Sequence, residues 1–514
     1  MSDNLSKIAD LQKRLDQTLE LGGAKKIATQ HKAGRLTARE RIQKLTDKDS
    51  FIERGQLATS DLPEAKASTP ADGKITGFAK ISNRRICISA DDVTVKAGAG
   101  GRVAGKKEYH LHDYSRQKGL PSVHLGDGGG ARIPDIMGAT GMMSFTVPTY
   151  LPPRSREVPL ITAIMGECYG SPTWRASVSD IVIQIKGCIM AVAGPPIVTA
   201  LTNEKITAEE LGGWEMHAKT TGLVDLFAED ENHCFDLIKS TLSYFPDNYQ
   251  QLPSTYQSHT PKNPNKDILK VLPEDARLTY DMHKLLEHIV DKDSLLELKP
   301  YYDGSLITTL ARIDGKVVGI LANNPKVMAG AMGPGACEKA VSFIALCDSF
   351  HIPLIFMHDT PGFYVNKAAE ERKMPVKIMN FIQALQYSSV PKISLIVRKS
   401  YGMAHCNMLG ANMGADTVMA FPMAEVSFMS PHVAAEIMLK HQLKDAENKG
   451  EIKANFLKEM NQINAPWEAA GENLIDRIID PRETRAELIE ALDIARGNKN
   501  GGMSERKMAG WMKM

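Results

Sequence analysis

Two stretches of this 514-residue chain, Pro121-Ser-Val-His-Leu-Gly-Asp-Gly-Gly-Gly130 and Pro353-Leu-Ile-Phe-Met-His-Asp-Thr-Pro-Gly362, share one pattern. Each has a proline, a short apolar run, an aspartate and a glycine turn, and the second follows the first by 232 residues at all of these anchors. An apolar run that ends in such a turn is typical of a buried strand. The spacing therefore predicts that one structural unit occurs twice in the chain.

Further pairs of anchors obey the same spacing. They are Ala97-Gly98 with Ala329-Gly330, Lys107 with Lys339, Val158-Pro159 with Val390-Pro391, and Tyr169-Gly170 with Tyr401-Gly402. Beyond them Asp180 and Pro195 match Asp416 and Pro431 at a spacing of 236, which indicates a small insertion. A unit of this length is too long for a solenoid repeat and indicates two homologous domains.

The boundary between the two domains is expected in a polar stretch. Residues 248–275 are rich in proline, serine and asparagine, which is typical of a linker. We therefore expect an N-terminal domain over residues 1–258 and a C-terminal domain over residues 259–514. The N-terminal domain begins with a polar helical segment in which Thr37 and Glu40 predict a capping box.

Three short apolar runs in each copy predict buried strands. They cover residues 86–90, 123–125 and 160–165 in the first copy, and 318–322, 354–357 and 393–397 in the second. A glycine-rich loop and a helix with a lysine follow the first run of each copy. This alternation predicts α/β layers, in which ligands bind at loops that follow strand ends.

Composition excludes several classes of protein. Lys+Arg 62 against Asp+Glu 61 gives a formal net charge of +1, which rules out a strongly basic nucleic-acid binder. The seven cysteines contain no Cys-x-x-Cys pair, so free thiols in a reducing compartment are expected. Neither a signal peptide nor an apolar run of the ~18 residues of a membrane helix is found. We therefore expect a cytoplasmic protein that binds neither membrane nor nucleic acid.

Several motifs that suggest other chemistry fail on inspection. In Gly100-Gly-Arg-Val-Ala-Gly-Lys-Lys107, Lys107 stands where a phosphate-binding P-loop needs Ser or Thr to bind Mg²⁺. The G-x-G-x-x-G spacing of dinucleotide sites and the G-x-S-x-G elbow of hydrolases are both missing. His110 and His112 lack a convincing third ligand, so no metal site is expected.

The glycine turns are better candidates for a functional site. They are 128–133 and Tyr169-Gly-Ser-Pro172 in the first copy, and Asp359-Thr-Pro-Gly362 and Tyr401-Gly-Met-Ala404 in the second. Small residues at a junction of strand and helix let backbone N–H groups approach a ligand. Two N–H groups on one carbonyl oxygen form an oxyanion hole, which can stabilise an enolate by several kcal/mol. Any one of these segments alone is also explained as an ordinary tight turn, but their paired occurrence favours function.

Short motifs in a fixed order along almost the whole chain identify a family resemblance. They are Gln30-His31, Gly34-Arg-Leu-Thr-Ala-Arg-Glu-Arg-Ile42, Asp49-Ser-Phe-Ile-Glu53, Asp92-Val-Thr94, Gly129-Gly-Ala-Arg-Ile133, Glu210-Leu-Gly-Gly213 with His217, Asp225, Glu338-Lys-Ala340, Asp359-Thr-Pro-Gly-Phe363, Val390-Pro391, Arg398-Lys-Ser-Tyr-Gly402 and Ile478-Ile-Asp-Pro481. In this order the chain resembles the carboxyltransferase (beta) subunit of biotin-dependent acyl-CoA carboxylases of the propionyl-CoA carboxylase type.

The resemblance implies a fold and a reaction. The fold is two tandem crotonase-like domains, each a β-β-α superhelix, with the active site between the N-terminal domain of one subunit and the C-terminal domain of another. The reaction moves a carboxyl group from carboxybiotin to the α-carbon, or the vinylogous γ-carbon, of an acyl-CoA. The N-terminal domain is expected to bind acyl-CoA and the C-terminal domain biotin.

The resemblance also implies partners and a cofactor. Biotin is the expected cofactor, attached to a separate biotin carboxylase or biotin carrier polypeptide, and no bound metal is expected. The expected assembly is a homo-oligomer, commonly a hexamer, or a hetero-oligomer with a paralogue.

Individual roles follow from the resemblance by position. The N–H groups of Gly170 and Ser171 are expected to bind the thioester oxygen, and those of Met403 and Ala404 the ureido oxygen of biotin. The candidates for the acyl-CoA side are Lys107, Gly129, Gly130, Ala131 and Arg132.

The chain departs from the family at several positions, among them His405 in place of a tyrosine and Val376 to Asn380 in place of an Arg-x-Gly-Ala-Lys-like segment. Ser171 and Met403 replace glycines, and Cys406 replaces an aspartate that lines the pocket in the family. His405 and Cys406 are therefore the expected determinants of acyl preference. Two other functions stay open: the carboxyltransferase subunit of a biotin-dependent acyl-CoA decarboxylase, and a non-catalytic structural subunit paired with an active paralogue.

Overall fold

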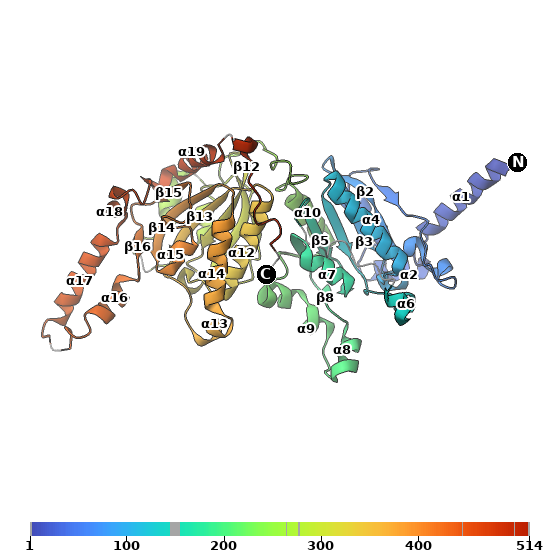
Figure 1. The fold of residues 1–514 in the computed structure, drawn as a ribbon, viewed down its shortest axis with the longest axis horizontal. Coiled ribbons are helices and arrows are strands. Elements are labelled where there is room, and N and C mark those ends of the chain that lie inside the picture. The colour runs from blue at the N-terminus through green and yellow to red at the C-terminus, as the bar shows by residue number, and fades with distance from the viewer. Residues whose placement is uncertain are drawn as a thin grey trace. The chain divides into compact units, whose positions relative to one another are not determined.

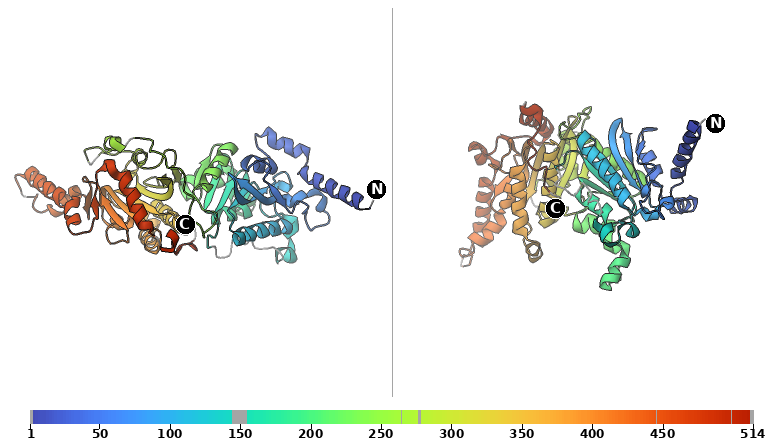
Figure 2. Two further views of the ribbon diagram at one scale, coloured as in Figure 1. Left: turned by 90° about the horizontal axis from the view of Figure 1, so that it is seen from above. Right: turned by 45° about the vertical axis from the view of Figure 1, so that its right-hand side comes forward.

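The computed structural model describes residues 3–143, 155–263, 265–275, 278–444, 446–497 and 499–511 (Figure 1). The chain divides between Gln251 and Leu252 into two compact units, called here unit 1 and unit 2. Each unit contains one large mixed sheet with helices packed on it, and Figure 2 shows both from two further directions. The predicted α/β layers are therefore confirmed.

Unit 1 contains a seven-stranded sheet in the order β1-β2-β3-β4-β5-β7-β9. The first two pairings are antiparallel, and every pairing from β3 onward is parallel. The strands are β1 (Ile52–Arg54), β2 (Lys74–Ile81), β3 (Arg84–Asp91), β4 (Ser122–Gly126), β5 (Leu160–Ile164), β7 (Ile181–Ile185) and β9 (Leu226–Ala228), with β6 (Glu167–Tyr169) and β8 (Ile189–Ala191) paired separately.

The helices of unit 1 follow the strands. They are α1 (Asp3–Leu19), α2 (Ala24–Lys32), α3 (Ala38–Leu45), α4 (Arg102–Lys118), α5 (Ile133–Ile136), α6 (Gly138–Met143), α7 (Ser171–Val178), α8 (Pro195–Thr202), α9 (Ala208–Gly212) and α10 (Glu231–Leu242), with short helical turns at η1 (Lys66–Ser68), η2 (Pro70–Gly73), η3 (Lys96–Gly98) and η4 (Met216–Thr221). Helix α4 packs on β2 and β3, and α10 packs on β7 and β9. The predicted capping box at the start of α3 is confirmed, since the Thr37 side chain accepts from the Glu40 amide and the Glu40 side chain accepts from the Thr37 amide.

Unit 2 repeats this plan in the order β10-β11-β12-β13-β14-β15-β17, with β16 paired to β14. The strands are β10 (Leu296–Leu298), β11 (Leu306–Ile313), β12 (Lys316–Asn323), β13 (Leu354–Thr360), β14 (Lys392–Tyr401), β15 (Thr417–Ala420), β16 (Glu425–Ser427) and β17 (Arg477–Ile478). The helices are α11 (Met282–Leu286), α12 (Pro334–Ser349), α13 (Lys367–Glu371), α14 (Met374–Tyr387), α15 (Met403–Asn407), α16 (Pro431–Met438), α17 (Lys449–Ile463), α18 (Pro466–Gly471) and α19 (Thr484–Arg496), with turns at η5 (Asn265–Lys270), η6 (Met328–Gly330), η7 (Pro481–Glu483) and η8 (Lys499–Gly502).

Equivalent strands of the two units pair through equivalent residues. Cys87 pairs with Ser122 across β3 and β4, and Gly319 pairs with Leu354 across β12 and β13. Both partners in unit 2 lie 232 positions after those in unit 1. The predicted duplication is therefore confirmed residue by residue.

The insertion inferred from the sequence also appears in the pairing register. Ile161 pairs with Ile181 in unit 1, and Ile393 pairs with Thr417 in unit 2. The first residue of each pair keeps the spacing of 232 and the second moves to 236. The four extra residues of unit 2 are therefore inserted between β14 and β15.

Helices α4 and α12 occupy equivalent places in the two units but are buried to different degrees. Helix α12 is buried along almost its whole length, because it lies between the sheet of unit 2 and α14. Its counterpart α4 buries only Ala104, Leu111, His112 and Ser115, and its other face is open. The same structural position is therefore sealed in unit 2 and accessible in unit 1.

Two further expectations concern the chain as a whole. All seven cysteines are free, and six of them are buried. Among the described residues, no helix has the length and apolarity needed to span a membrane.

Candidate active site

Two short helices begin at equivalent places in the two units. Helix α7 follows Gly170, whose φ is 69°, and α15 follows Gly402, whose φ is 58°. Their ψ angles of −117° and −150° combine with positive φ into a conformation that side chains strongly disfavour. Glycine is therefore required at both positions to turn the strand into the helix.

The amides of these two glycines are used inside their own units. The Gly170 N–H donates to the Ala191 carbonyl at 3.2 Å, and the Gly402 N–H donates to the Ser427 carbonyl at 2.9 Å. Each bond ties the start of the helix to a neighbouring strand, β8 or β16. Gly170, expected from sequence to donate to a ligand, already has an acceptor in the protein.

The next residues provide the candidate donors in unit 2. Met403 and Ala404 are the first two residues of α15, and their N–H groups have no acceptor among the described residues. The Met403 side chain is 46% exposed, whereas Ala404 is buried. Ser171 occupies the place of Met403 in unit 1, as the first residue of α7.

The glycine turn after β4 contacts the start of α7. Gly130 has a φ of 83°, and a Cβ atom built on it would lie only 2.5 Å from the Tyr169 carbonyl oxygen. A Cβ built on Gly170 would lie 3.7 Å from the Cα of Gly130. The chain therefore brings together two backbone segments that are about 40 residues apart, a separation that a parallel crossover readily spans.

In the glycine turn after β4, some backbone N–H groups donate to protein carbonyls and others have no acceptor among the described residues. The Gly129 N–H donates to the Ala97 carbonyl at 2.9 Å, and Gly129 is exposed. The N–H groups of Gly130 and Ala131 have no acceptor among the residues that the structure describes. Gly130 and Ala131 thus provide donors beside Ser171, and this grouping was not specified by the sequence.

A buried ion cluster, the Arg132 brace (Arg132, Asp72 and Asp135), supports the turn. The Arg132 guanidinium donates to Asp135 at 2.7 Å and to Asp72 at 2.6 Å, and its side chain is 6% exposed. The hydrogen bond from Arg132 lowers the pKa of Asp135, whereas burial raises the pKa of Asp72. Arg132, a sequence candidate for acyl-CoA binding, therefore has its charge compensated within the unit.

Lys107 is likewise bound to the protein. Its Nζ donates to the carbonyl of Ala71 at 2.7 Å and to that of Lys74 at 2.5 Å. Burial lowers the pKa of Lys107 to about 8. The side chain thus fastens η2, which carries Asp72 of the Arg132 brace, to α4.

A second buried network lies behind the glycine turn and was not predicted. Arg41 of α3 donates to Asp127 at 2.8 Å and to Glu231 at 2.7 Å. Asp127 is the last residue before the three glycines, and its own N–H donates to Asp91 at 3.1 Å. Only the folded chain reveals this pairing, because Asp127 and Glu231 are 86 and 190 residues from Arg41.

One group of side chains among the described residues could in principle hold a metal ion. It consists of Asp91, Glu108 and His124. The ammonium of Lys74, itself 2% exposed, donates to Asp91 within this group. An internal cation therefore already compensates the buried carboxylates.

His405 points into unit 2. Its Nδ1 lies 2.9 Å from Ser400 Oγ, which in turn lies 2.8 Å from Nδ1 of His358, and His358 Nε2 lies 2.9 Å from Ser394 Oγ. Burial lowers the pKa of His405 and holds that of His358 well below its usual range. A Cβ built on Gly410 would lie 2.1 Å from His405 Nε2, so this edge of the ring packs against Gly410.

The tyrosines of the two turns are hydrogen-bond donors. The Tyr169 hydroxyl donates to Glu167 at 3.1 Å, and the Tyr401 hydroxyl donates to Glu425. Burial raises the pKa of Tyr169 to about 12 and raises that of Tyr401 further. Neither tyrosine can therefore act as a base near neutral pH. Cys406, the other sequence candidate, is half-buried with a free thiol.

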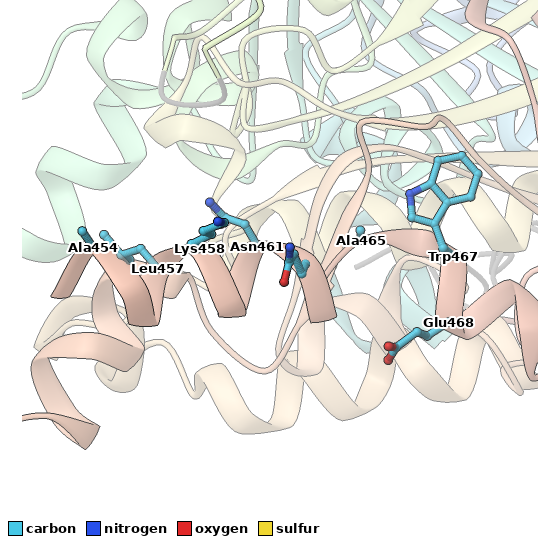
Figure 3. A pocket seen from close by; sticks show the side chains of 8 residues that line it. Ala454, Leu457, Lys458, Asn461, Ala465, Trp467 and Glu468 are labelled. Atoms are coloured by element: carbon cyan, nitrogen blue, oxygen red, sulfur yellow. The ribbon is translucent and has the colours of Figure 1, made fainter. Parts of the chain in front are cut away.

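A cavity in unit 2 is lined by neither of these turns. It has a volume of about 780 Å³ and follows one face of α17 and the start of α18 (Figure 3). Its lining residues are Ala454, Leu457, Lys458, Asn461, Gln462, Ala465, Trp467 and Glu468. None of the site residues expected from the sequence is among them.

Comparisons with known proteins agree on one family. The model of the carboxyl transferase domain matches residues 29–508. The chain is 32% identical over 510 residues to methylmalonyl-CoA decarboxylase subunit alpha from Propionigenium modestum, covering 97% of this chain and 98% of that protein. It is 32% identical over 503 residues to the biotin-dependent acetyl-/propionyl-coenzyme A carboxylase beta5 subunit of Mycobacterium tuberculosis, covering 95% and 91%.

A solved structure extends the agreement to the fold. The crystal structure of transcarboxylase 12S, titled as a hexamer with methylmalonyl-coenzyme A and methylmalonic acid bound, matches with a TM-score of 0.90 at 30% identity, covering 98% of this chain and 99% of that one. The predicted tandem crotonase-like α/β fold is thereby confirmed. The relatives act on different acyl groups by name, so the propionyl-CoA type is not singled out. With a matching domain over nearly its whole length and relatives above 30% identity, the chain belongs to the carboxyl transferase family.

Proposed function

We propose that this protein transfers a carboxyl group between biotin, carried by a separate polypeptide, and the α-carbon of an acyl-CoA. The observation that carries the proposal is the duplicated junction at Gly170 and Gly402, which places backbone N–H donors at the start of a short helix in each unit. Two sets of donors suit a reaction in which two different oxygens become negative. The family match supports the reaction class.

Unit 1 is proposed to bind the acyl thioester. The N–H groups of Gly130 and Ala131 are the proposed donors to the thioester oxygen, and the start of α7, which contacts the glycine turn, is the proposed neighbouring wall of the site. Charge on this oxygen grows as the α-proton leaves, so the donors bind the enolate more strongly than the thioester. The Arg132 brace holds the turn in place during this change.

Unit 2 is proposed to bind the ureido group of biotin. The N–H groups of Met403 and Ala404 lack acceptors among the described residues, and they fit a ligand that presents a single oxygen. Biotin, when bound, supplies the carboxyl group and the nitrogen that exchanges a proton with the α-carbon. The protein then needs no side-chain base, which agrees with the protonated hydroxyls of Tyr169 and Tyr401, whose pKa burial raises above the usual value.

A protein surface is expected to cover each junction. Val192 and Phe428 directly follow the carbonyls that accept the Gly170 and Gly402 amides, and their side chains are 66% and 80% exposed. Apolar side chains exposed at equivalent positions beside both turns indicate contact surfaces rather than isolated exposure. Together with the hexamer named for transcarboxylase 12S, this supports a homo-oligomer, a hexamer or a hetero-oligomer with a paralogue, whose neighbouring subunits complete each site.

The proposal is tested by reconstitution. The purified chain is combined with a biotin carboxylase and its biotinylated carrier, ATP, labelled bicarbonate and a panel of acyl-CoA thioesters. Acid-stable label in the acyl-CoA fraction that disappears on addition of avidin is the expected result. A chain that binds the biotinylated partner, labels no thioester in the panel and transfers no carboxyl group from methylmalonyl-CoA to the carrier would instead identify a structural subunit.

A second candidate is decarboxylation by the same site, which is favoured by the match to a methylmalonyl-CoA decarboxylase subunit. The donors that stabilise an enolate serve both directions equally, because each passes through the same intermediate. The chain is then incubated with carboxyl-labelled methylmalonyl-CoA and the biotinylated carrier without ATP. Rapid transfer of label to the carrier, together with no ATP-driven labelling of any acyl-CoA, identifies the decarboxylase subunit.

A further inference from the structure

Each unit has a buried aspartate directly before its glycine turn, Asp127 in unit 1 and Asp359 in unit 2. The backbone N–H groups of these two residues donate to side chains at equivalent positions, Asp91 and Asn323, both at 3.1 Å. A carboxylate buried in this way needs a cation beside it. The two units can therefore be compared by where that cation comes from.

In unit 2 the cations come from the neighbouring strand. Arg398 Nε lies 3.4 Å from Asp359 Oδ2 and Lys399 Nζ lies 3.3 Å from Asp359 Oδ1, and both residues belong to β14, which pairs with β13. At the spacing of 232 their counterparts in unit 1 are Gly166 and Glu167. The strand that neighbours Asp127 thus offers no cation at these two places.

In unit 1 the cation comes from α3. A Cβ atom built on Gly166 would lie 1.8 Å from Asp127 Oδ1, so no side chain fits at this point. Arg41 instead donates to Asp127 at 2.8 Å and to the Met165 carbonyl at 3.2 Å. The same guanidinium donates to Glu231, the first residue of α10, at 2.7 Å. One side chain from outside the sheet therefore binds the ends of β4 and β5 together.

Arg41 binds between two backbone hydrogen bonds that join the same segments. The Met165 N–H donates to the Gly126 carbonyl at 2.8 Å, and the Tyr169 N–H donates to the Gly128 carbonyl at 3.2 Å. The first segment continues into the glycine turn, and the second continues through β6 into α7. A guanidinium is planar and its donors are fixed relative to one another. Its bonds therefore set how far apart the glycine turn and the start of α7 lie.

We propose that Arg41 is a positioning residue for the thioester site of unit 1. It fixes the glycine turn against the start of α7, and so fixes the direction of the N–H groups of Gly130 and Ala131. This inference rests on the proposed function, in which those groups bind the thioester oxygen. Arg41 acts through the backbone of β4 and β5 and not on the substrate. A displacement of about 1 Å caused by a remote residue can lower a rate about 100-fold.

A simpler role for Arg41 is compensation of the Asp127 charge alone. The double variant Arg41→Met/Asp127→Asn separates the two roles, because it removes the carboxylate charge together with the cation. The bond to the Met165 carbonyl stays lost in this variant. We therefore expect the double variant to regain part of the urea midpoint that Arg41→Met loses, but not to regain kcat. Recovery of kcat along with the midpoint overturns the positioning role.

The kinetic experiment uses the full chain in the reconstituted transfer assay. Arg41→Met is expected to lower kcat about 10- to 100-fold with KM for the acyl-CoA little changed, because the donors bind the enolate more strongly than the thioester. Arg41→Lys should fall between this variant and the wild type, since one ammonium replaces the fork of donors. The matched control is Arg39→Met on the same helix, which breaks an ion pair with Glu53 at 3.1 Å and should keep kcat. Equal kcat in Arg41→Met and Arg39→Met overturns the proposal.

Hydrogen exchange tests the positioning without any activity. Exchange is measured over residues 126–132 and 165–172, with residues 358–364 and 397–404 of unit 2 as the internal reference. Both Arg41 variants are expected to exchange faster at the two unit 1 segments only, because fewer bonds hold these segments closed. Unchanged exchange there, or an equal increase in Arg39→Met, overturns the inference whatever the rates are.

The same measurements separate this inference from the proposed function. A local increase in exchange in a chain whose wild type transfers no carboxyl group supports the positioning by Arg41 and overturns the proposed reaction. If Arg41→Met does not fold, Arg41→Lys supplies both the rate and the exchange, and wild-type values of both in that variant overturn the proposal.

Discussion

Ser171 and Met403 occupy equivalent positions in the two duplicated units. Each is the first residue of a helix, and each follows a glycine whose N–H is bonded to a neighbouring strand and whose φ is positive. The duplication thus sets two N–H donors in the same local geometry while giving them different side chains. The donor belongs to the backbone, so its chemistry survives the exchange of serine for methionine.

Replacing Met403 by proline is expected to remove one donor of the proposed biotin site without unfolding α15. Proline is tolerated at the first position of a helix, where the N–H has no intrahelical acceptor. Loss of one such donor typically lowers kcat about 10²-fold or more. Met403→Ala keeps the N–H and is expected to stay near the wild-type rate. Similar transfer rates for both variants, each with a native unfolding transition, would exclude Met403 N–H as a donor.

Gly170→Ala is expected to destabilise unit 1 by backbone strain alone. A Cβ at this position meets only the Gly130 Cα, at 3.7 Å, so no clash adds to the cost of φ 69°. A loss of about 1–3 kcal/mol is expected from urea unfolding. Gly105→Ala is the control, because Gly105 lies inside α4 with open space around its Cα. That change should stabilise the protein by about 0.5–1 kcal/mol, and a loss there would show that alanine perturbs this unit generally.

Arg132→Met is expected to be strongly destabilising because it leaves two buried carboxylates, Asp72 and Asp135, without their cation. Removing one member of a buried charge network typically costs about 3–5 kcal/mol. Arg132→Lys should recover only part of this, since an ammonium cannot bridge both carboxylates as a guanidinium does. Arg102→Met breaks a more exposed ion pair, between Arg102 at the start of α4 and Asp61, and should barely shift the urea midpoint. Comparable losses from Arg132→Met and Arg102→Met would contradict the brace.

Acid is expected to destabilise the protein through buried histidines. Burial depresses the pKa of His358 and of His405, so the unfolded chain binds protons near pH 6.5 that the folded chain does not bind. The stability that these two neutral histidines contribute is fully present above about pH 6.5. As the pH falls towards the pKa values of the folded state, the free energy of unfolding decreases by up to about 1.4 kcal/mol per pH unit for each proton. His358→Phe should lower stability at pH 7.5, because it removes the bond to Ser394 and one of the two bonds of Ser400, yet flatten the decline between pH 6.5 and 5. Urea midpoints across this range measure both effects, and an equally steep decline in the variant would refute the role of His358.

Much of the fold follows from local pattern. The apolar runs, their glycine ends and their constant spacing predict six strands and a duplication. The structure has strands at all six places, and the pairing of Cys87 with Ser122 and of Gly319 with Leu354 confirms the duplication. These features can be predicted because a strand and its turn each depend on a few neighbouring residues. The capping box of Thr37 and Glu40 was predictable for the same reason.

The candidate site was predicted less completely. The sequence pointed to Gly170 as a donor, but its N–H is bonded to Ala191, a residue of another strand. It also pointed to Lys107 and Arg132 as charges for a ligand, whereas both are bound to groups far along the chain. Side chains that look free in a sequence acquire partners when strands separated by crossovers lie side by side.

The sequence alone determined that the protein is two copies of an α/β unit, that glycine must stand before each short helix, and that the chain belongs with carboxyltransferases. The tertiary structure decided which backbone N–H groups and which charged side chains have partners within the protein and which could still bind a ligand. Arg41 with Asp127, and Asp72 with Arg132, are joined across 86 and 60 residues, and α12 is sealed where α4 is open. The physical reason is that conformation is local along the chain, whereas hydration and charge compensation depend on which segments pack together.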